Sequence, residues 1–184
     1  GKDATLGLYL FQVMKQNWIR PNVITYSAAI SACAKTNIPD RAVELLKQMH
    51  RQQLTPNVIT YNAAISACEK GGHWELALRL VMRMRRCNVG PDVITYNTLI
   101  STCEKGKRPD RALDLIQAMQ QESLAPDLIA YNAAISACTR GALWVEALQL
   151  LHSIGQQGLV PDVITYSALI SVCEKCVQWE RALE

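Results

Sequence analysis

The chain has 184 residues, 49% of them hydrophobic, and its 19 basic and 16 acidic side chains give a formal net charge of +3. This composition is typical of a folded globular protein and excludes a largely disordered chain, and no apolar run reaches the roughly 18 residues that a membrane-spanning helix needs, so we expect no membrane partner. The net charge is too small to indicate a nucleic-acid partner by itself, so the placement of the charges has to decide that question.

The motif Pro-[Asn/Asp]-x-Ile-x-Tyr-[Asn/Ser] occurs five times, each copy 35 residues after the previous one. Its prolines are Pro21, Pro56, Pro91, Pro126 and Pro161. A fixed period of this size indicates a repeat array, and each Pro-Asx closes one repeat. The expected domains are a partial repeat (second helix) over 1–22, complete repeats over 23–57, 58–92, 93–127 and 128–162, and a partial repeat over 163–184.

Residues 1–20 align with the second half of a repeat and predict one helix. In each following repeat, a first helix of about 12 residues is predicted from apolar residues at i, i+3, i+4 and i+7, which lie on one helix face. In chain order these positions hold Tyr26, Ala29, Ile30 and Cys33; Tyr61, Ala64, Ile65 and Cys68; Tyr96, Leu99, Ile100 and Cys103; Tyr131, Ala134, Ile135 and Cys138; and Tyr166, Leu169, Ile170 and Cys173.

Glycines predict the turn after three of these helices, since glycine suits a helix C-cap. They are Gly71 with Gly72, Gly106 and Gly141. A second helix follows, predicted in one repeat from Leu76, Leu80 and Met84, and Pro39 and Pro109 stand at its start in two others. One hairpin cannot bury both apolar faces alone, so the sequence predicts an all-α fold, an α-solenoid of stacked helix–turn–helix hairpins. Trp74, Trp144 and Trp179 share one position of the second helix and are expected to pack between repeats.

The chain resembles pentatricopeptide repeat (PPR) proteins with P-type repeats. The resemblance rests on the 35-residue period, the V-I-T-Y-N opening of the first helix, the A-L-x-L-[LVI]-x-x-[MI] pattern of the second and the closing Pro-Asp or Pro-Asn, and it covers essentially the whole chain. It implies sequence-selective binding of single-stranded RNA, one base per repeat. It also implies a role in organellar RNA processing, stability or translation, in a mitochondrion or chloroplast.

The resemblance implies that two residues of each repeat read the base: the one after the tyrosine and the last one of the repeat. The complete pairs are Ser27 with Asn57, Asn62 with Asp92, Asn97 with Asp127, and Asn132 with Asp162, while Ser167 and Asn22 each lack a partner. The implied base-sandwiching residues are Ile24, Ile59, Ile94, Ile129 and Ile164. An Asn amide and a carboxylate suit the carbonyls and N3–H of uracil, whereas a hydroxyl and an amide suit adenine. The expected core is 5′-AUUU-3′, read from the N-terminus. The alternative is that these Ser, Asn and Asp side chains only cap helices.

A basic residue recurs near the end of every first helix. The five are Lys35, Lys70, Lys105, Arg140 and Lys175. Such a row suits the phosphates of an RNA backbone. The alternative is that a cation is favoured at a helix C-terminus by the helix dipole.

No catalytic, metal or cofactor site is predicted. Five of the seven cysteines occupy the same core position, where a thiol acts as a small apolar group, and Cys173 with Cys176 is a single CxxC without a second pair. His50, His73 and His152 fall at three different repeat positions. We therefore expect no enzyme and no small-molecule substrate in this segment, although both chain ends look cut and an enzymatic domain could lie beyond them. Other protein subunits are candidate partners, and the alternative function is a protein-binding or ribosomal scaffold solenoid.

Overall fold

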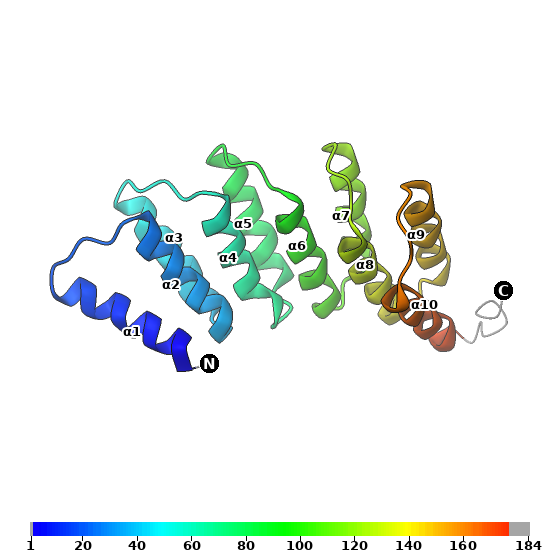
Figure 1. The fold of residues 1–184 in the computed structure, drawn as a ribbon, viewed down its shortest axis with the longest axis horizontal. Coiled ribbons are helices and arrows are strands. Elements are labelled where there is room, and N and C mark those ends of the chain that lie inside the picture. The colour runs from blue at the N-terminus through cyan, green and yellow to red at the C-terminus, as the bar shows by residue number, and fades with distance from the viewer. Residues whose placement is uncertain (1, 177–184) are drawn as a thin grey trace. The chain divides into compact units, whose positions relative to one another are not determined.

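The computed structural model describes residues 2–176, without the side chain of Lys2, so Trp179 and the end of the last predicted repeat lie outside the described residues. Every regular element in this range is an α-helix (Figure 1). The helices are α1 (Lys2–Gln16), α2 (Val23–Thr36), α3 (Pro39–Arg51), α4 (Val58–Glu69), α5 (Trp74–Arg86), α6 (Val93–Lys105), α7 (Pro109–Gln121), α8 (Leu128–Gly141), α9 (Trp144–Gln156) and α10 (Val163–Lys175). None of them is long and apolar enough to cross a bilayer.

The helices form two compact units, an N-terminal unit (Gly1–Thr98) and a C-terminal unit (Leu99–Glu184). In the N-terminal unit, α2 packs against α1, α3 and α4, and α4 packs against α5. In the C-terminal unit, α8 packs against α7, α9 and α10. The consecutive first helices α2 and α4, and likewise α8 and α10, therefore lie against each other, and α2, α4 and α8 each have their own second helix beside them.

The first helices begin where a polar side chain satisfies the backbone N–H groups of the first turn. Asn57, Asp127 and Asp162 are the N-caps of α4, α8 and α10, and each accepts a hydrogen bond from the backbone three residues later. The second helices begin differently. α3 and α7 have proline in the first turn, as predicted, and α5 and α9 begin at half-buried tryptophans.

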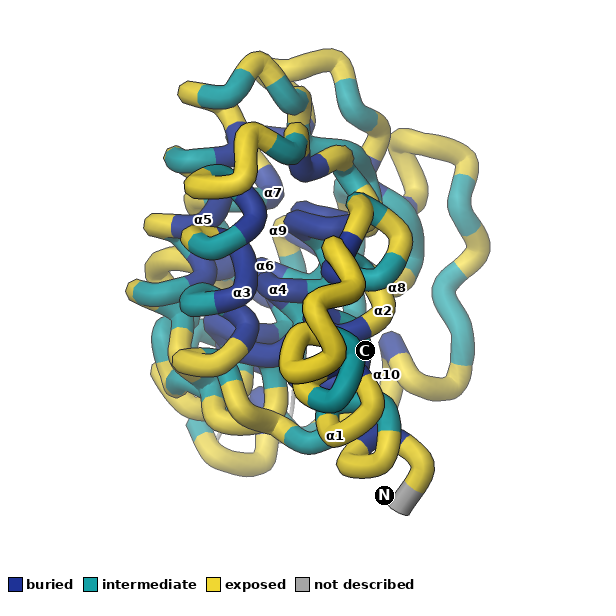
Figure 2. The backbone as a smooth tube through the Cα atoms, turned by 90° about the vertical axis from the view of Figure 1, so that its left-hand side faces the viewer, coloured by how far each residue is buried: buried dark blue, intermediate teal, exposed yellow. Residues whose placement is uncertain are grey.

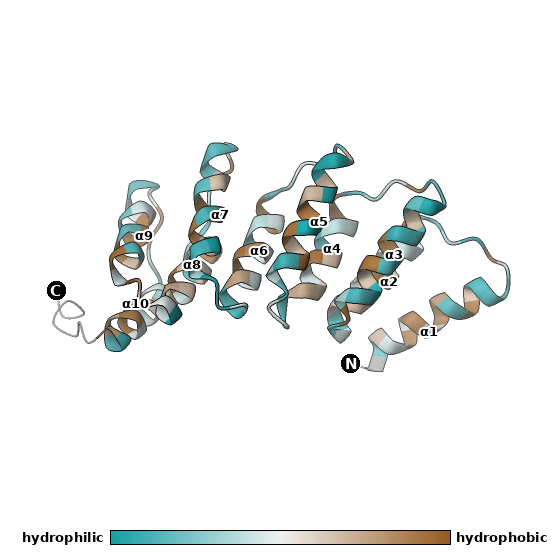
Figure 3. Ribbon diagram, turned by 180° about the vertical axis from the view of Figure 1, so that it is seen from behind, coloured by the Kyte–Doolittle hydropathy of each residue, from teal (hydrophilic) through white to brown (hydrophobic). Residues whose placement is uncertain are grey.

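The predicted apolar face of the first helices forms the core, and Figures 2 and 3 show the buried, apolar residues recurring along the helices. The tyrosines Tyr26, Tyr61, Tyr96 and Tyr131 are almost completely buried. The prediction is wrong at two positions of α10, since Tyr166 and Ile170 are 52% and 56% exposed. The reason is that α10 packs against α8 and α9 only, and no other described helix covers its remaining side.

The predicted glycine turn after the first helix is confirmed at Gly72, which has φ of 62°, but not at Gly106 and Gly141. The residues with left-handed backbone there are Asn37, Gly72, Lys107 and Ala142. Gly106 and Gly141 stand one position too early, although Gly141 has a packing reason: a Cβ atom there would lie 2.9 Å from Cγ of Pro109. A second left-handed position follows the second helices, and it holds Trp18, Gln53, Asn88, Ser123 and Gly158.

Replacing Gln53 with glycine should stabilise the protein, because a side chain with φ of 57° strains the backbone by about 1 kcal/mol and glycine removes that strain. The expected result is a higher free energy of unfolding in urea titrations. Gln52 is the matched control: its φ is −88°, so glycine there should leave stability unchanged or lower it. Equal effects of the two substitutions would contradict the argument.

Candidate nucleic-acid interface

The second pair of predicted reading residues forms a closed hydrogen-bond network inside the N-terminal unit. Asn62 Nδ2 donates to Asp92 Oδ1 over 3.0 Å. The hydroxyl of Thr95 lies 2.6 Å from Asn62 Oδ1 and 2.7 Å from Asp92 Oδ1, and shares its proton between these two acceptors. The Thr95 N–H also donates to Asp92 Oδ1, over 2.8 Å. Thr95 therefore holds both members of the pair in fixed positions.

The fourth pair repeats this geometry inside the C-terminal unit. Asn132 Nδ2 donates to Asp162 Oδ1 over 3.2 Å, and the hydroxyl of Thr165 lies 2.6 Å from Asn132 Oδ1. Both the N–H and the hydroxyl of Thr165 bond Asp162 Oδ1, at 2.8 and 2.9 Å. Two pairs in separate units thus have the same arrangement of donors and acceptors.

The first pair is linked through a threonine instead of directly. Thr60 donates both its N–H and its hydroxyl to Asn57 Oδ1, at 3.0 and 2.8 Å. The Ser27 hydroxyl lies 2.8 Å from the Thr60 hydroxyl. Since the Thr60 proton points to Asn57, Ser27 must be the donor to Thr60, which leaves the Ser27 oxygen as an acceptor.

The remaining predicted reading residues are not assembled into such a network within one unit. Asn97 and Asp127 belong to different units, and Asp127 caps α8 by accepting from the Ala130 N–H over 2.9 Å. Asn22 caps α2 in a reciprocal box with Thr25. Ser167 is exposed on α10.

Capping uses only one of the two terminal atoms of these side chains. The side-chain bonds of Asp92 to Asn62 and Thr95, and those of Asp162 to Asn132 and Thr165, involve Oδ1. Those of the Asn57 side chain to Thr60 likewise involve its oxygen. Asp92 Oδ2 and Asn57 Nδ2 thus have no hydrogen-bond partner in any other described residue. One end of each side chain holds the helix, and the other is available to a ligand.

Both networked carboxylates are held in the ionised state. Partial desolvation opposes ionisation of Asp92, but the hydrogen bonds from Thr95 and Asn62 outweigh it and lower the pKa of Asp92 below its ordinary value of 3.8. The N–H and hydroxyl of Thr165 lower the pKa of Asp162 in the same direction. At neutral pH each carboxylate can therefore only accept hydrogen bonds.

Near the start of each first helix, one isoleucine is exposed. The exposed fractions are 76% for Ile24, 69% for Ile59, 63% for Ile94, 66% for Ile129 and 64% for Ile164. The recurrence at one position of all five first helices distinguishes these isoleucines from apolar residues scattered singly over a surface.

In the C-terminal unit, several predicted site residues line one depression of about 580 Å³. Asn132, Ile164 and Ser167 contribute a polar and an apolar wall, and Arg140 and Lys175 stand at the same depression. Glu104 and Glu174 line it too, and Glu104 accepts a hydrogen bond from Ser136 over 2.8 Å. A polar base edge, an apolar base face and a phosphate would each find a matching group there.

All five basic residues of the predicted row are exposed, and they stand in the last turns of the first helices or immediately after them. This placement is compatible with both alternatives, a contact with phosphate and a favourable interaction with the helix dipole.

The threonines that join the reading residues were missed in the sequence, although a signal was present. The T of V-I-T-Y recurs at Thr25, Thr60, Thr95 and Thr165 and is replaced only by Ala130. Thr60, Thr95 and Thr165 are completely buried. A buried hydroxyl that recurs at a fixed position needs a fixed partner, and in the structure the predicted reading residues supply it.

All seven cysteines are free thiols. Cys87, at the end of α5, accepts a hydrogen bond from the Tyr61 hydroxyl and lies 3.4 Å from His50 Nε2. In the next two repeats, Arg85 donates to the Tyr96 hydroxyl and Gln120 to the Tyr131 hydroxyl, and both occupy the repeat position of His50. No cluster of metal-ligating side chains exists within residues 2–176.

Burial should make the core thiols slow to react. It raises the pKa of Cys33, Cys68 and Cys103 to about 11 and that of Cys138 to about 12, while Cys87 and Cys176 are half-buried. We expect iodoacetamide to alkylate the two half-buried thiols first, because only the thiolate reacts and it must be accessible. Peptide mass spectrometry measures the order in which the thiols are alkylated, and unfolding in urea should abolish the difference between them. Equal labelling of Cys68 and Cys87 in the folded protein would contradict this expectation.

Family models match nearly the whole chain. A model of the PPR repeat family matches residues 56–105, 91–140 and 126–175, and a model of the pentatricopeptide repeat domain matches residues 1–36 and 10–72. No curated protein matches the chain.

Solved structures share the fold. The pentatricopeptide repeat protein PPR10 from maize has 28% sequence identity and a TM-score of 0.75, over 95% of this chain and 25% of PPR10. PPR10 in complex with an 18-nt psaJ RNA element has a TM-score of 0.76 and 24% sequence identity, over 97% of this chain and 27% of that chain. The PPR domain of Arabidopsis thaliana protein-only RNase P 1, in complex with tRNA, has a TM-score of 0.70 and 18% sequence identity, over 84% of this chain and 83% of that chain. The predicted all-α repeat solenoid is confirmed, and the chain spans about a quarter of the length of PPR10.

Proposed function

Because the chain belongs to the pentatricopeptide repeat family, we propose that it binds single-stranded RNA sequence-selectively, with one base at each reading pair. The observation that carries the proposal is the networked pair of Asn62 and Asp92, in which one polar atom caps the helix while another stays available, together with the exposed isoleucines. Two solved relatives, PPR10 and the PPR domain of protein-only RNase P 1, are in complex with RNA.

Uracil is the base that fits an Asn–Asp pair. The second N–H of Asn62 can donate to O2 of a pyrimidine, and Asp92 Oδ2 can accept from the uracil N3–H, directly or through a water molecule. Asn132 and Asp162 are joined by the same hydrogen bonds as this pair, so we assign uracil to them as well. Adenine fits the first pair, since the Ser27 oxygen can accept from N6–H and Asn57 Nδ2 can donate to N1. With the third pair assigned by its residue types, the proposed core is 5′-AUUU-3′.

Isoleucines and cations would complete the contact with each nucleotide. The exposed isoleucines give the bases apolar surfaces to stack on, and the five cations near the ends of the first helices would contact phosphates. Five such contacts correspond to a slope of roughly −3.5 in a plot of log affinity against log salt concentration.

We place this activity in organellar RNA processing, stability or translation, in a mitochondrion or chloroplast, as the family resemblance implies. Family members generally bind RNA without catalysing a reaction, and the RNase P 1 structure matches through its PPR domain. We propose no catalytic activity for this segment.

Fluorescence anisotropy with RNA probes of about 10 nucleotides tests the proposal. AUUU probes should bind at least about 10-fold more tightly than scrambled probes of equal composition, since each wrong base leaves polar groups unpaired. A salt titration should give the negative slope above. Equal binding of AUUU and scrambled probes would refute the base assignments, and absence of any RNA binding would favour the alternative, a protein-binding or ribosomal scaffold.

A further inference from the structure

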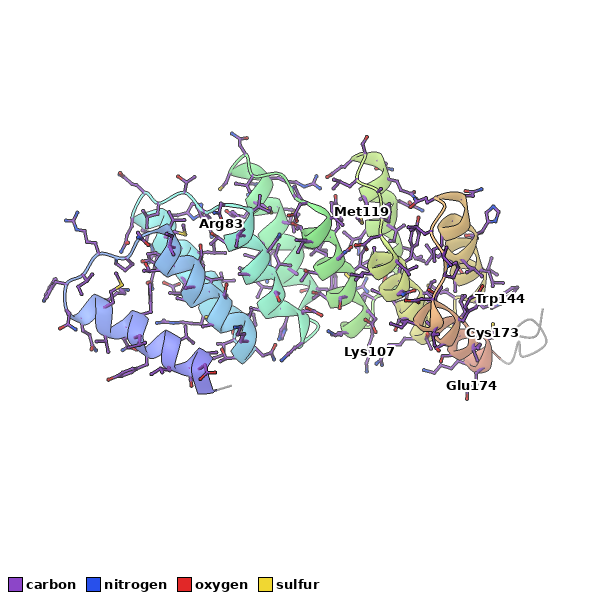
Figure 4. The ribbon with its side chains drawn as sticks, viewed as in Figure 1. Arg83, Lys107, Met119, Trp144, Cys173 and Glu174 are labelled. Atoms are coloured by element: carbon purple, nitrogen blue, oxygen red, sulfur yellow. The ribbon has the colours of Figure 1, made fainter. Side chains whose placement is uncertain are left out.

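The outer side of α5 carries a cluster of arginines that the RNA-reading residues do not explain. Arg79, Arg83 and Arg86 are spaced i, i+4 and i+7 and lie on one stripe of the helix, about 10 Å long, opposite the buried residues. Met82 stands between them and is 54% exposed. We call these four residues the arginine face; Figure 4 marks Arg83.

The repeat fold does not require these arginines. The other complete repeats provide the comparison, because the same three positions recur 35 residues apart. They hold Glu44, Gln48 and Arg51 in α3, Asp114, Ala118 and Gln121 in α7, and Gln149, Ser153 and Gln156 in α9. Only α5 has a cation at all three positions, so the cluster is a property of this helix and not of the scaffold.

No carboxylate in the described part of the chain is ion-paired with the cluster, although Asp40 and Glu75 line the same depression as Arg79. By contrast, Arg51 of α3 pairs with Glu44 at 3.8 Å. Arg83 is half-buried and interacts with the Tyr61 hydroxyl, while Arg79 and Arg86 are exposed. Positive charges at i, i+4 and i+7 of one helix repel one another, and a bound anion relieves this repulsion.

We propose that the arginine face binds the phosphate backbone of an RNA strand, as a sequence-independent contact separate from the reading pairs. Guanidinium groups bind phosphate oxygens with paired hydrogen bonds, and a polyanion satisfies several of them at once. An acidic protein partner fits less well, because protein interfaces are built around apolar and aromatic anchors and this face exposes only Met82. The contact does not depend on base readout and would exist even if the reading assignment were wrong.

The test uses Arg79→Gln/Arg86→Gln, which installs the residues that α9 carries at these positions and leaves Arg83 with Tyr61. Arg20→Gln/Arg41→Gln is the matched control, since it removes the same charge from exposed residues elsewhere. Anisotropy is measured with an AUUU probe of about 10 nucleotides, and with probes of about 30 nucleotides with and without AUUU. Circular dichroism confirms that both variants are folded.

We expect the salt slope for both long probes to become shallower by about 1.4 in the arginine-face variant, the loss of two phosphate contacts, and that for the short probe to stay unchanged. The control should leave all slopes as they are. If the wild-type protein binds the long probes without preferring AUUU, the reading proposal fails, but the slope change should persist. An unchanged slope, an equal change in the control, or no binding of any long probe overturns the proposal. So does arginine-dependent binding of polyglutamate as tight as that of RNA, which would indicate an acidic protein partner.

Discussion

Replacing Asp92 with asparagine should change the second base of the preferred RNA from uracil to cytosine. The substitution replaces Oδ2, which can only accept a hydrogen bond, by an NH₂ group, which can only donate. Uracil has a donor at N3 and cytosine has an acceptor there. The mismatch leaves a polar group unpaired in the complex, which corresponds to about 10-fold or more in the ratio of the two affinities.

The fold should tolerate this substitution, because the oxygen that caps α6 is retained. Asn57 occupies the same position before α4, where its Oδ1 accepts from the Thr60 N–H over 3.0 Å. The corresponding bond of Asp92 is 2.8 Å long. Asn62 donates to the same Oδ1, so its position should also be kept.

Anisotropy with four RNAs that differ only at the second base measures the change. Asp162→Asn is the matched control, because its network has the same geometry and it should affect only the fourth base. If Asp92→Asn weakened the binding of all four RNAs equally, Asp92 would act as a helix cap alone and not as a reading residue.

Much of the fold could be predicted from the sequence because the periods of 35 and 3.6 residues both constrain it. The first period separates the hairpins, and the second identifies Tyr61, Ala64, Ile65 and Cys68 as a buried face. The exposure of Tyr166 and Ile170 could not be predicted, since the pattern is the same as in the buried copies and only the neighbouring helices differ. The pattern specifies which side a residue is on, and neighbours determine whether that side is covered.

The sequence predicts which positions form the candidate site, but not how the atoms of their side chains are bonded. Capping and base reading were alternatives for Asn57 and Asp92, because residue types alone do not say which atom of a side chain is occupied. The structure shows that both side chains cap a helix through Oδ1. It also shows that capping leaves the other terminal atom of each side chain available. The bridging role of Thr95 also depends on atomic distances, and threonine in V-I-T-Y is equally typical of an ordinary helix start.

Replacing Thr95 with valine should both destabilise the protein and relax the choice of the second base. Valine has the same shape without the hydroxyl, so it removes the bonds to Asn62 Oδ1 and Asp92 Oδ1 and the one accepted from the Asp92 N–H. Thr95 is completely buried, and one of the acceptors is charged. We therefore expect the free energy of unfolding to fall by about 2 kcal/mol.

Thr25→Val is the control that distinguishes the loss of a bridging hydroxyl from the loss of an ordinary capping hydroxyl. Within the described part of the chain, the Thr25 hydroxyl bonds only backbone atoms of Asn22, at 2.8 and 2.9 Å, and no side chain of a predicted reading pair. Its loss should lower stability by about 1 kcal/mol or less and leave base preference unchanged. Urea titration gives the stabilities, and the four-RNA comparison gives the preference.

One effect of Thr95→Val concerns the whole protein and the other a single base, and this difference makes the bridging role testable. Loss of stability concerns the whole protein, whereas relaxed discrimination should be confined to the second base, because Thr165 still holds Asn132 and Asp162. Ala130 shows that the scaffold tolerates a first helix without this hydroxyl, so the variant should remain folded. Unchanged discrimination at the second base in a folded Thr95→Val protein would mean that the reading residues are positioned by their own bond, Asn62 Nδ2 to Asp92 Oδ1, and that the threonine contributes to stability alone.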